Sequence, residues 1–286
     1  MAKRLVISAM VLIAGLASAL VLHAQTAAPK WNNDSQVFPV QKPDEASNHK
    51  KAPPPIRDLS GTWDAGGGSG IQAFGAKNMP SDGKPEHELP YTPLGREKFL
   101  ANKPGFGVTE VPAAQVTDPV DFCDPQGTPR NSLYELRVTQ IAQLPNKVLI
   151  LYEFNQVWRV IWTDGHTLPK DPDPRWFGYS VGKWEDDYTF VVQTVGVDER
   201  TWLDNAGRPH SADMRVEERY HRVDRDTLEL TVTIDDPQMY TKPWVALDKL
   251  PLRLRPADFD VQEMICSPSE TADYNKVIGN PVDGKK

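Results

Sequence analysis

The residue types best suited to chemistry gather in one polar segment, residues 197–213. Its candidates for chemistry are two of its carboxylates, an imidazole, a serine hydroxyl and an indole, carried by Asp198, Asp204, His210, Ser211 and Trp202. An imidazole titrates near neutral pH, and a carboxylate beside it can orient it as a general base. We therefore expect His210, held by Asp198 or Asp204, to be able to transfer protons. The simpler alternative is a loop histidine that bonds to the backbone.

Other kinds of catalytic site have less support. Ser211 lacks the Gly-x-Ser-x-Gly turn that exposes a hydrolase nucleophile, so a serine-hydrolase triad is disfavoured. The six histidines show no zinc-enzyme spacing, and neither cysteine has a second ligand close by in the sequence. Asp235 and Asp236 are adjacent acids without further ligands, which is a weak pattern for calcium. We expect no metal and no cofactor.

Three strands are predicted around this segment, over Tyr188–Gly196, Met214–Val223 and Leu228–Asp235. Alternation puts one carboxylate, Glu218, on an apolar face. The other members of that face are Met214, Val216, Tyr220, Leu228, Leu230, Val232 and Ile234, and the opposite face carries Arg215, Glu217, Arg219, His221, Glu229, Thr231, Thr233 and Asp235.

A carboxylate on an apolar face loses hydration, which raises its pKa unless a cation pairs with it. Arg159 is the candidate partner of Glu218, because it shares a strand face with Val157 and Ile161. The pair has two interpretations: a buried ion pair that sets strand register, or an acid or base that faces a cavity.

The predicted site therefore has two groups of residues. The predicted catalytic residues are Asp198, His210 and Glu218, and the predicted ligand-binding residues are Arg159, Trp202, Asp204, Ser211 and Tyr220. Most of the eight tryptophans are expected in the core or as loop anchors, although several could line a cavity for a flat apolar ligand or a sugar. We expect Trp202 at the mouth of such a cavity.

The remaining strands are short and joined mostly by short turns, which predicts a mainly β fold. Such a chain forms an antiparallel meander, curled or closed into a barrel. One short helix is expected over residues 92–100, where Thr92 can cap the first turn and Pro93 suits the first helical position. Long Pro- and Gly-rich loops precede the main strands, which are expected over Leu59–Asp64, Leu133–Ile141, Lys147–Phe154, Val157–Thr163, Tyr179–Trp184, Tyr240–Leu247 and Leu250–Leu254.

The N-terminal region has the pattern of an exported chain. Lys3 and Arg4 precede an apolar run, and small residues follow, so residues 1–24 are predicted to be a signal peptide. The alternative is an uncleaved membrane anchor. Residues 25–58 form a Pro-rich linker, residues 59–286 one β domain, and no membrane association is expected after cleavage.

The cysteine count supports an exported protein, and the net charge argues against a nucleic-acid partner. The chain has only two cysteines, Cys123 and Cys266, and a lone pair in an exported chain indicates a disulfide. Two unpaired thiols are the alternative. The net charge of −7 argues against a nucleic-acid partner, which needs a basic surface.

Several segments resemble known proteins. Gly61-Thr62-Trp63 resembles the Gly-x-Trp opening of lipocalin-type barrels. Five further segments resemble a family of exported bacterial proteins of uncharacterised activity: Cys123–Arg130, Trp176–Glu185, Asp198–Asp204, Gly207–Ser211 and Glu218-Arg219. The resemblance covers most of the chain after residue 59. It implies a lipocalin-like barrel in the periplasm or outside the cell, and it implies no particular reaction.

Two functions fit these observations. The first is a barrel that binds a small, partly apolar or ring-shaped molecule, favoured by the apolar inner faces and the aromatic content. The second is a barrel enzyme, a lyase, isomerase or hydrolase, in which Asp198, His210 and Glu218 transfer protons. A structural envelope protein is a third alternative. The sequence indicates no oligomeric state.

Overall fold

The structure is a computed structural model, and it describes residues 53–66, 70–72, 79–134 and 136–274 of the 286. The predicted signal peptide and most of the predicted linker lie outside the described residues. All described residues fall within one compact unit, Lys50–Lys286. None of the helices in these ranges is long and apolar enough to cross a bilayer.

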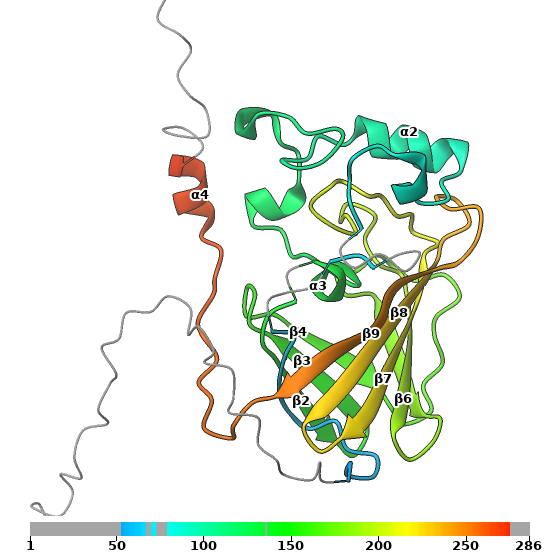
Figure 1. Cartoon of the computed structure of the whole chain (residues 1–286), viewed down its shortest axis with the longest axis vertical. Helices are drawn as coiled ribbons and strands as arrows, with labels where there is room; N and C mark the ends of the chain where they lie inside the picture. The colour runs from blue at the N-terminus through cyan, green and yellow to red at the C-terminus, as the bar shows by residue number, and fades with distance from the viewer. Residues whose placement is uncertain (1–52, 67–69, 73–78, 135, 275–286) are drawn as a thin grey trace, which may run out of the picture. The chain divides into compact units, whose positions relative to one another are not determined.

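The described strands form one closed barrel (Figure 1). Strands that follow one another in sequence are paired, and the first strand closes the barrel by pairing with the last, with Trp63 opposite Leu254. The mainly β, lipocalin-like barrel is therefore confirmed. The strands are β1 Gly61–Asp64, β2 Thr139–Leu144, β3 Lys147–Tyr152, β4 Trp158–Trp162, β5 Tyr179–Trp184, β6 Thr189–Val195, β7 Arg215–Asp224, β8 Thr227–Asp235 and β9 Trp244–Leu254.

Short helices lie between and after these strands. The longest, α2, confirms the predicted helix: Thr92 accepts a hydrogen bond from the backbone of Gly95 at 3.0 Å, and Pro93 is the first helical residue. The helices are η2 Pro85–His87, α2 Pro93–Ala101, η3 Ala113–Gln115, η4 Pro119–Phe122, α3 Arg130–Leu133 and α4 Pro268–Tyr274.

One pair of strands departs from the antiparallel meander. β4 and β5 run parallel, and they pair only through Ile161 with Ser180 and Trp162 with Val181. Parallel neighbours need a long crossover, because the chain must return to the end at which it started. Residues 163–178 form this crossover. The need for a crossover explains why the Pro- and Asp-rich connection between β4 and β5 is longer than a hairpin turn.

Two predicted strand boundaries were wrong. The strand expected from Leu133 begins only at Thr139, because Arg130–Leu133 forms a helical turn that inserts Leu133 into the core. The two weak strands expected after Tyr240 are one strand, β9. Its register against β8 shifts twice, and Lys249 has a φ of 51°, so extra residues are accommodated as bulges without ending the strand.

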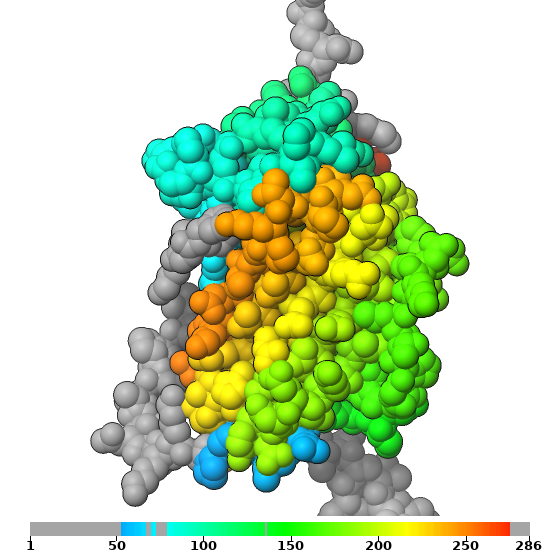
Figure 2. All heavy atoms as spheres, turned by 90° about the vertical axis from the view of Figure 1, so that its right-hand side faces the viewer, coloured from blue at the N-terminus to red at the C-terminus, as the bar shows by residue number. Residues whose placement is uncertain are grey.

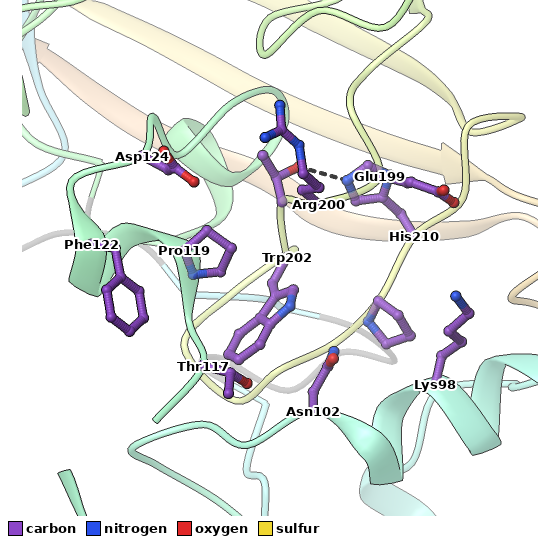
Figure 3. Close-up of a pocket in the computed structure, with 12 residues that line it drawn as sticks. Lys98, Asn102, Thr117, Pro119, Phe122, Asp124, Glu199, Arg200, Trp202 and His210 are labelled. Carbon is purple, nitrogen blue, oxygen red and sulfur yellow. Dashed lines mark hydrogen bonds between the residues drawn. The ribbon is translucent and has the colours of Figure 1, made fainter. Parts of the chain in front are cut away.

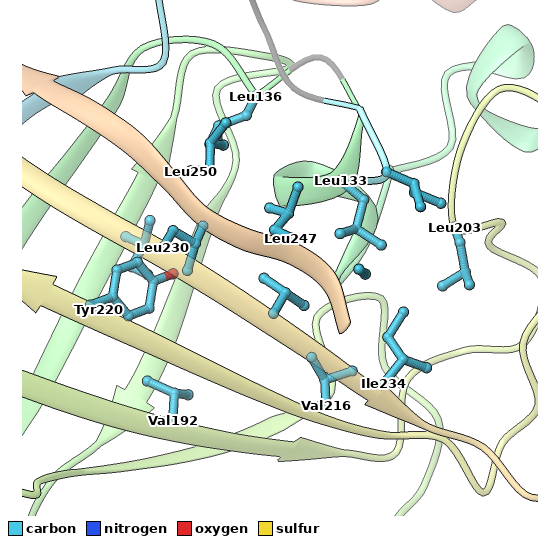
Figure 4. Packing of buried hydrophobic residues seen from close by; sticks show 14 of the residues in the cluster. Leu133, Leu136, Val192, Leu203, Val216, Tyr220, Leu230, Ile234, Leu247 and Leu250 are labelled. Atoms are coloured by element: carbon cyan, nitrogen blue, oxygen red, sulfur yellow. The ribbon is translucent and has the colours of Figure 1, made fainter. Parts of the chain in front are cut away.

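The expected faces of β7 and β8 are confirmed. Met214, Val216, Glu218 and Tyr220 are buried, whereas Arg215 and His221 on the opposite face are exposed. Figure 4 shows the inward side chains of β7 and β8 packed with Leu247 and Leu250 of β9 and with Leu133 of α3. The barrel interior is thus a packed core in which apolar side chains cover one another.

A segment before the main strands covers one end of the barrel. The backbone of Thr92 donates to the carbonyl oxygen of Met239 at 2.9 Å, and Thr241 donates to that of Pro90 at 2.7 Å. Gly95 allows this approach, because a Cβ there would collide with the same Met239 carbonyl. Figure 2 shows the result, with the cyan segment on the orange connection between β8 and β9.

We predict that Gly182→Ala destabilises the protein by about 1–3 kcal/mol, the usual cost of overpacking a core. A Cβ at Gly182 on β5 would collide with the ring of Phe190 and lie 2.8 Å from Cγ2 of Ile161. Gly105→Ala is the matched control, since its nearest neighbour there would be Cγ2 of Val116 at 3.6 Å. Urea unfolding of both variants checks this, and equal small effects would show that the interior is loosely packed.

Candidate functional site

The polar segment 197–213 connects β6 to β7 and is fixed at several points. The backbone of Leu203 donates to the carbonyl oxygen of Arg208 at 2.8 Å, and the side chain of Leu203 is fully buried, directed towards the core as Figure 4 shows. Asp204 and Arg208 form a buried ion pair inside the segment. The segment is therefore an ordered structure that can hold side chains in place.

Ser211 is fixed by a carboxylate at the end of β8. Asp236 accepts hydrogen bonds from the backbone nitrogen of Ser211 at 2.6 Å and from its hydroxyl at 2.7 Å. Asp236 also accepts from the backbone of Gln238 at 3.2 Å, which fixes the carboxylate in turn. Because its hydroxyl is bonded to Asp236, Ser211 holds the segment against β8 and is not paired with His210 as a nucleophile.

A pocket of about 520 Å³ opens beside this segment (Figure 3). Its walls come from three parts of the chain: the C-terminal half of α2, the η4 region and the 197–213 segment. They comprise four charged, four neutral polar and four apolar residues, namely Lys98, Asp124, Glu199 and Arg200; Asn102, Thr117, Thr201 and His210; and Pro119, Phe122, Trp202 and Pro209.

His210 and Trp202 both lie in this pocket, as Figure 3 shows. Nε2 of His210 is 2.6 Å from the hydroxyl of Thr201, and Nδ1 is 3.1 Å from the carbonyl oxygen of Ser211. The hydrogen bonds of the ring are thus to a hydroxyl and a backbone carbonyl, and neither Asp198 nor Asp204 bonds to it. The simpler alternative, a loop histidine bonded to the backbone, fits the contact of Nδ1 with the Ser211 carbonyl oxygen. It does not account for the contact of Nε2 with the Thr201 hydroxyl.

The hydrogen-bond partners assign the tautomer of His210. Burial lowers its pKa, so the ring is neutral near pH 7. A carbonyl oxygen only accepts, so the single ring hydrogen sits on Nδ1 and points to Ser211. Nε2 then accepts from the Thr201 hydroxyl, whose other contact, to the carbonyl oxygen of Asp198, is longer at 3.0 Å. The pocket therefore contains a basic nitrogen bonded to a hydroxyl group.

The two predicted carboxylates of the segment have cationic partners. Asp198 pairs with Arg200 at 2.7 Å, and this hydrogen bond lowers the pKa of Asp198. Asp204 is bonded to Arg208. The Arg200 guanidinium also lies 4.5 Å from the ring centroid of Trp176, which fixes its direction. Neither Asp198 nor Asp204 lines the pocket; their observed contacts shape the segment that does.

Glu218 and Arg159 form the expected ion pair, inside the barrel. Both are fully buried, and two hydrogen bonds of 2.6 and 3.1 Å join the guanidinium to the carboxylate. Arg159 also donates to the hydroxyls of Ser180 at 3.0 Å and Thr194 at 2.7 Å, and Tyr220 donates to Glu218 at 3.1 Å. Burial opposes the charge on Arg159, but the adjacent Glu218 carboxylate raises its pKa overall.

This network does not belong to the pocket. None of Arg159, Glu218 and Tyr220 is among the lining residues, so the predicted catalytic residues do not meet in one place. Of the predicted site residues, the pocket contains His210 and Trp202. Its other charged and polar residues were not predicted. Glu199, Arg200 and Thr201 belong to the 197–213 segment, whereas Lys98, Asn102, Thr117 and Asp124 come from segments without regular alternation.

The predicted disulfide is confirmed. Cys123 and Cys266 are bonded, with Cα atoms 5.4 Å apart. Cys123 stands between Phe122 and Asp124, both of which line the pocket. The disulfide therefore holds one wall of the pocket against the C-terminal part of the domain. The predicted bond of Cys123 was the sequence feature that indicated a long-range contact for this wall.

We predict that His210 contributes to the pH dependence of stability. Its folded-state pKa lies below the unfolded value of about 6.5, so the unfolded chain takes up the proton first as the pH falls. The contribution is complete above about pH 6.5 and is lost as the pH drops towards the folded-state pKa. His210→Gln should therefore flatten the loss of stability measured by urea unfolding between about pH 7.5 and 5.5.

The control for this measurement is His221→Gln, on the outer face of β7. It removes an exposed imidazole from the neighbouring strand, so an effect shared by both variants does not come from burial of His210. If His210→Gln and the wild type lose stability equally over this range, then His210 is not held neutral by burial.

The fold and the pocket together define a class: a closed lipocalin-like β-barrel with a mixed polar and aromatic pocket outside its packed core. No protein-family model, curated protein or solved structure matches the chain. Among the residues that the structure describes, no group of three or more histidine, cysteine, aspartate or glutamate residues is arranged to hold a metal ion.

Proposed function

We propose that this protein binds a small, partly apolar or ring-shaped molecule in the pocket beside Trp202. The observation that carries the proposal is the position of Trp202, whose indole lies among the lining residues between Phe122 and Asn102 (Figure 3). An aromatic ring in a concave site gives a ligand a large contact area, and the polar groups around it give orientation. The site differs from the barrel interior expected of a lipocalin-type binder, because the core side chains fill that interior.

The test is a thermal-shift screen of small ring compounds, including indole and methyl glucoside, followed by calorimetry on the hits. Trp202→Ala is expected to weaken binding by about tenfold or more, because a buried aromatic anchor typically contributes at least that much. Trp158→Ala is the matched control, since Trp158 is 61% exposed on the barrel wall. Hits that bind equally well to Trp202→Ala would place the ligand elsewhere.

A proton-transfer enzyme is the second candidate, favoured by the hydrogen bond between Nε2 of His210 and the Thr201 hydroxyl. Under this proposal His210 is the base, and the predicted roles of Asp198 and Glu218 reduce to structural ones. His210→Ala should then abolish turnover of a bound compound while leaving its affinity nearly unchanged, since a base contributes mainly in the transition state. Unchanged turnover in this variant would leave only the binding function.

We also propose that the protein acts in the periplasm or outside the cell. The disulfide supports this, because disulfides persist in oxidising compartments. The charged and apolar N-terminal sequence supports it as well, and so does the resemblance to a family of exported proteins. N-terminal sequencing of the protein recovered from the periplasm should find a start near residue 25, and an intact Met1 in the cytoplasm would contradict export.

A further inference from the structure

The charges that line the pocket have both signs. Two cations, Lys98 and Arg200, and two carboxylates, Asp124 and Glu199, are among the lining residues, and Arg200 is already bonded to Asp198. An anionic ligand would meet the carboxylates and a cationic ligand would meet the cations, and like charges brought together without water between them are destabilising. The lining therefore favours a ligand without net charge.

Three of these four charged groups are available to a ligand. Lys98, Asp124 and Glu199 have no ion pair and no side-chain hydrogen bond within the described part of the chain, whereas Arg200 is bonded to Asp198. A purely apolar ligand would cover these groups and remove their water without replacing its hydrogen bonds, which costs free energy for each group. The ligand should therefore offer hydrogen-bond donors to the carboxylates and acceptors to the ammonium group.

The apolar part of the lining consists of rings. Trp202 and Phe122 are aromatic, and Figure 3 shows Pro119 near Phe122; Pro209 completes this set of lining residues. Aromatic faces pack against flat patches of C–H groups, and the negative potential of a ring face attracts these weakly positive hydrogens. The ligand thus needs an apolar face as well as polar edges.

From the charges of both signs, the unpaired charged groups and the aromatic lining we infer that the pocket binds a neutral saccharide. A pyranose ring has apolar C–H faces and an edge of hydroxyl groups that donate and accept, which is the combination that the lining requires. The pocket volume of about 520 Å³ suits one or two sugar units. This inference rests on the proposed binding function, and it narrows the ligand to one chemical class.

The test is calorimetry of the intact, disulfide-bonded protein with neutral sugars: glucose, galactose, mannose, N-acetylglucosamine, cellobiose, maltose and lactose. Indole, laurate, choline and inorganic phosphate represent a flat apolar ring, a lipid, a cation and an anion. At least one sugar is expected to bind. Asp124→Leu and Trp202→Ala should each weaken that sugar by about tenfold or more, through the loss of a charge-assisted hydrogen bond or a stacking face.

Two matched control variants show whether a loss of binding is specific to the pocket. Asp171→Leu changes an exposed carboxylate in the crossover, and Trp158→Ala removes an exposed indole; both should bind the sugar like the wild type. Circular dichroism and thermal unfolding of all four variants identify any that fail to fold, and Asp124→Asn and Trp202→Leu replace the two pocket variants in that case.

The outcomes separate this inference from the function on which it rests. Binding of indole or laurate that depends on Trp202, with no sugar bound, overturns the saccharide assignment and leaves the binding function standing. Sugar binding that Asp124→Leu and Trp202→Ala leave unchanged overturns the assignment of this pocket. No binding by any probe overturns both.

Discussion

Replacing Glu218 with alanine should destabilise the protein by about 3–5 kcal/mol, the usual result of removing one partner from a buried ion pair. The variant leaves the Arg159 guanidinium charged and fully buried in the barrel, with no carboxylate bonded to it and with neutral partners such as the hydroxyls of Ser180 and Thr194. The arginine cannot avoid this cost by losing its proton, because a guanidinium stays protonated in proteins. The measurement is the free energy of unfolding from a urea titration.

The position of the pair makes the effect large. β4 and β5 share only two paired positions, and Arg159 on β4 reaches across them to Ser180 on β5 and to Thr194 on β6. The pair thus supplies polar contacts at one of the two strand junctions that have only two paired positions, the other being β1 with β9. Loss of Glu218 should weaken this junction first.

Two controls define the result. Glu217→Ala, on the outer face of the same strand, should change stability by no more than about 0.5 kcal/mol. The double variant Arg159→Met/Glu218→Leu should recover much of the loss, since no charge is then left unpaired. Equal, small effects for Glu217→Ala and Glu218→Ala would contradict a structural role for the pair.

Removing the disulfide should have an effect of similar size. Cys123 and Cys266 are 143 residues apart, and closing a loop of that length restricts the unfolded chain by about 5 kcal/mol in the chain-entropy model. The double variant Cys123→Ser/Cys266→Ser should therefore unfold at a much lower urea concentration than the wild type. Ligand affinity should also fall, because Phe122 and Asp124 flank Cys123.

The reduced wild-type protein is the control for this variant, and the two should unfold at the same urea concentration. Thiol titration of the unfolded, unreduced protein should find no free thiol. Two titratable thiols, or a double variant as stable as the oxidised protein, would refute the bond or its contribution.

The barrel and the buried pair could be predicted because alternation carries direct information about burial. On β7 and β8 one face is buried, so a two-residue period assigned Glu218 to the interior and Arg159 as its partner. Thr92 and Pro93 likewise predicted the start of α2 from local chemistry alone. The face of each strand and the start of α2 could thus be predicted from residues that are close together in the sequence.

The pocket could not be predicted in the same way. Lys98, Thr117 and Asp124 come from segments without regular alternation, and they meet the 197–213 segment only through tertiary contacts. The parallel junction was missed for a related reason: its crossover contains no helix, so residues 163–178 resemble an ordinary loop. Cys123 was the only residue near the pocket whose chemistry predicted a long-range contact.

Closure of the barrel by its last strand sets the order in which the chain can complete its fold. While the chain is being synthesised, a sheet of β1 to β8 has free edges at β1 and β8, and free edges pair readily with other chains. β9 covers both edges at once, with Trp63 opposite Leu254 and Leu228 opposite Leu252. Cys266 follows β9 in the chain, so the disulfide can form after the barrel has closed. Until β9 pairs, the edges of β1 and β8 are open to pairing with strands of other chains.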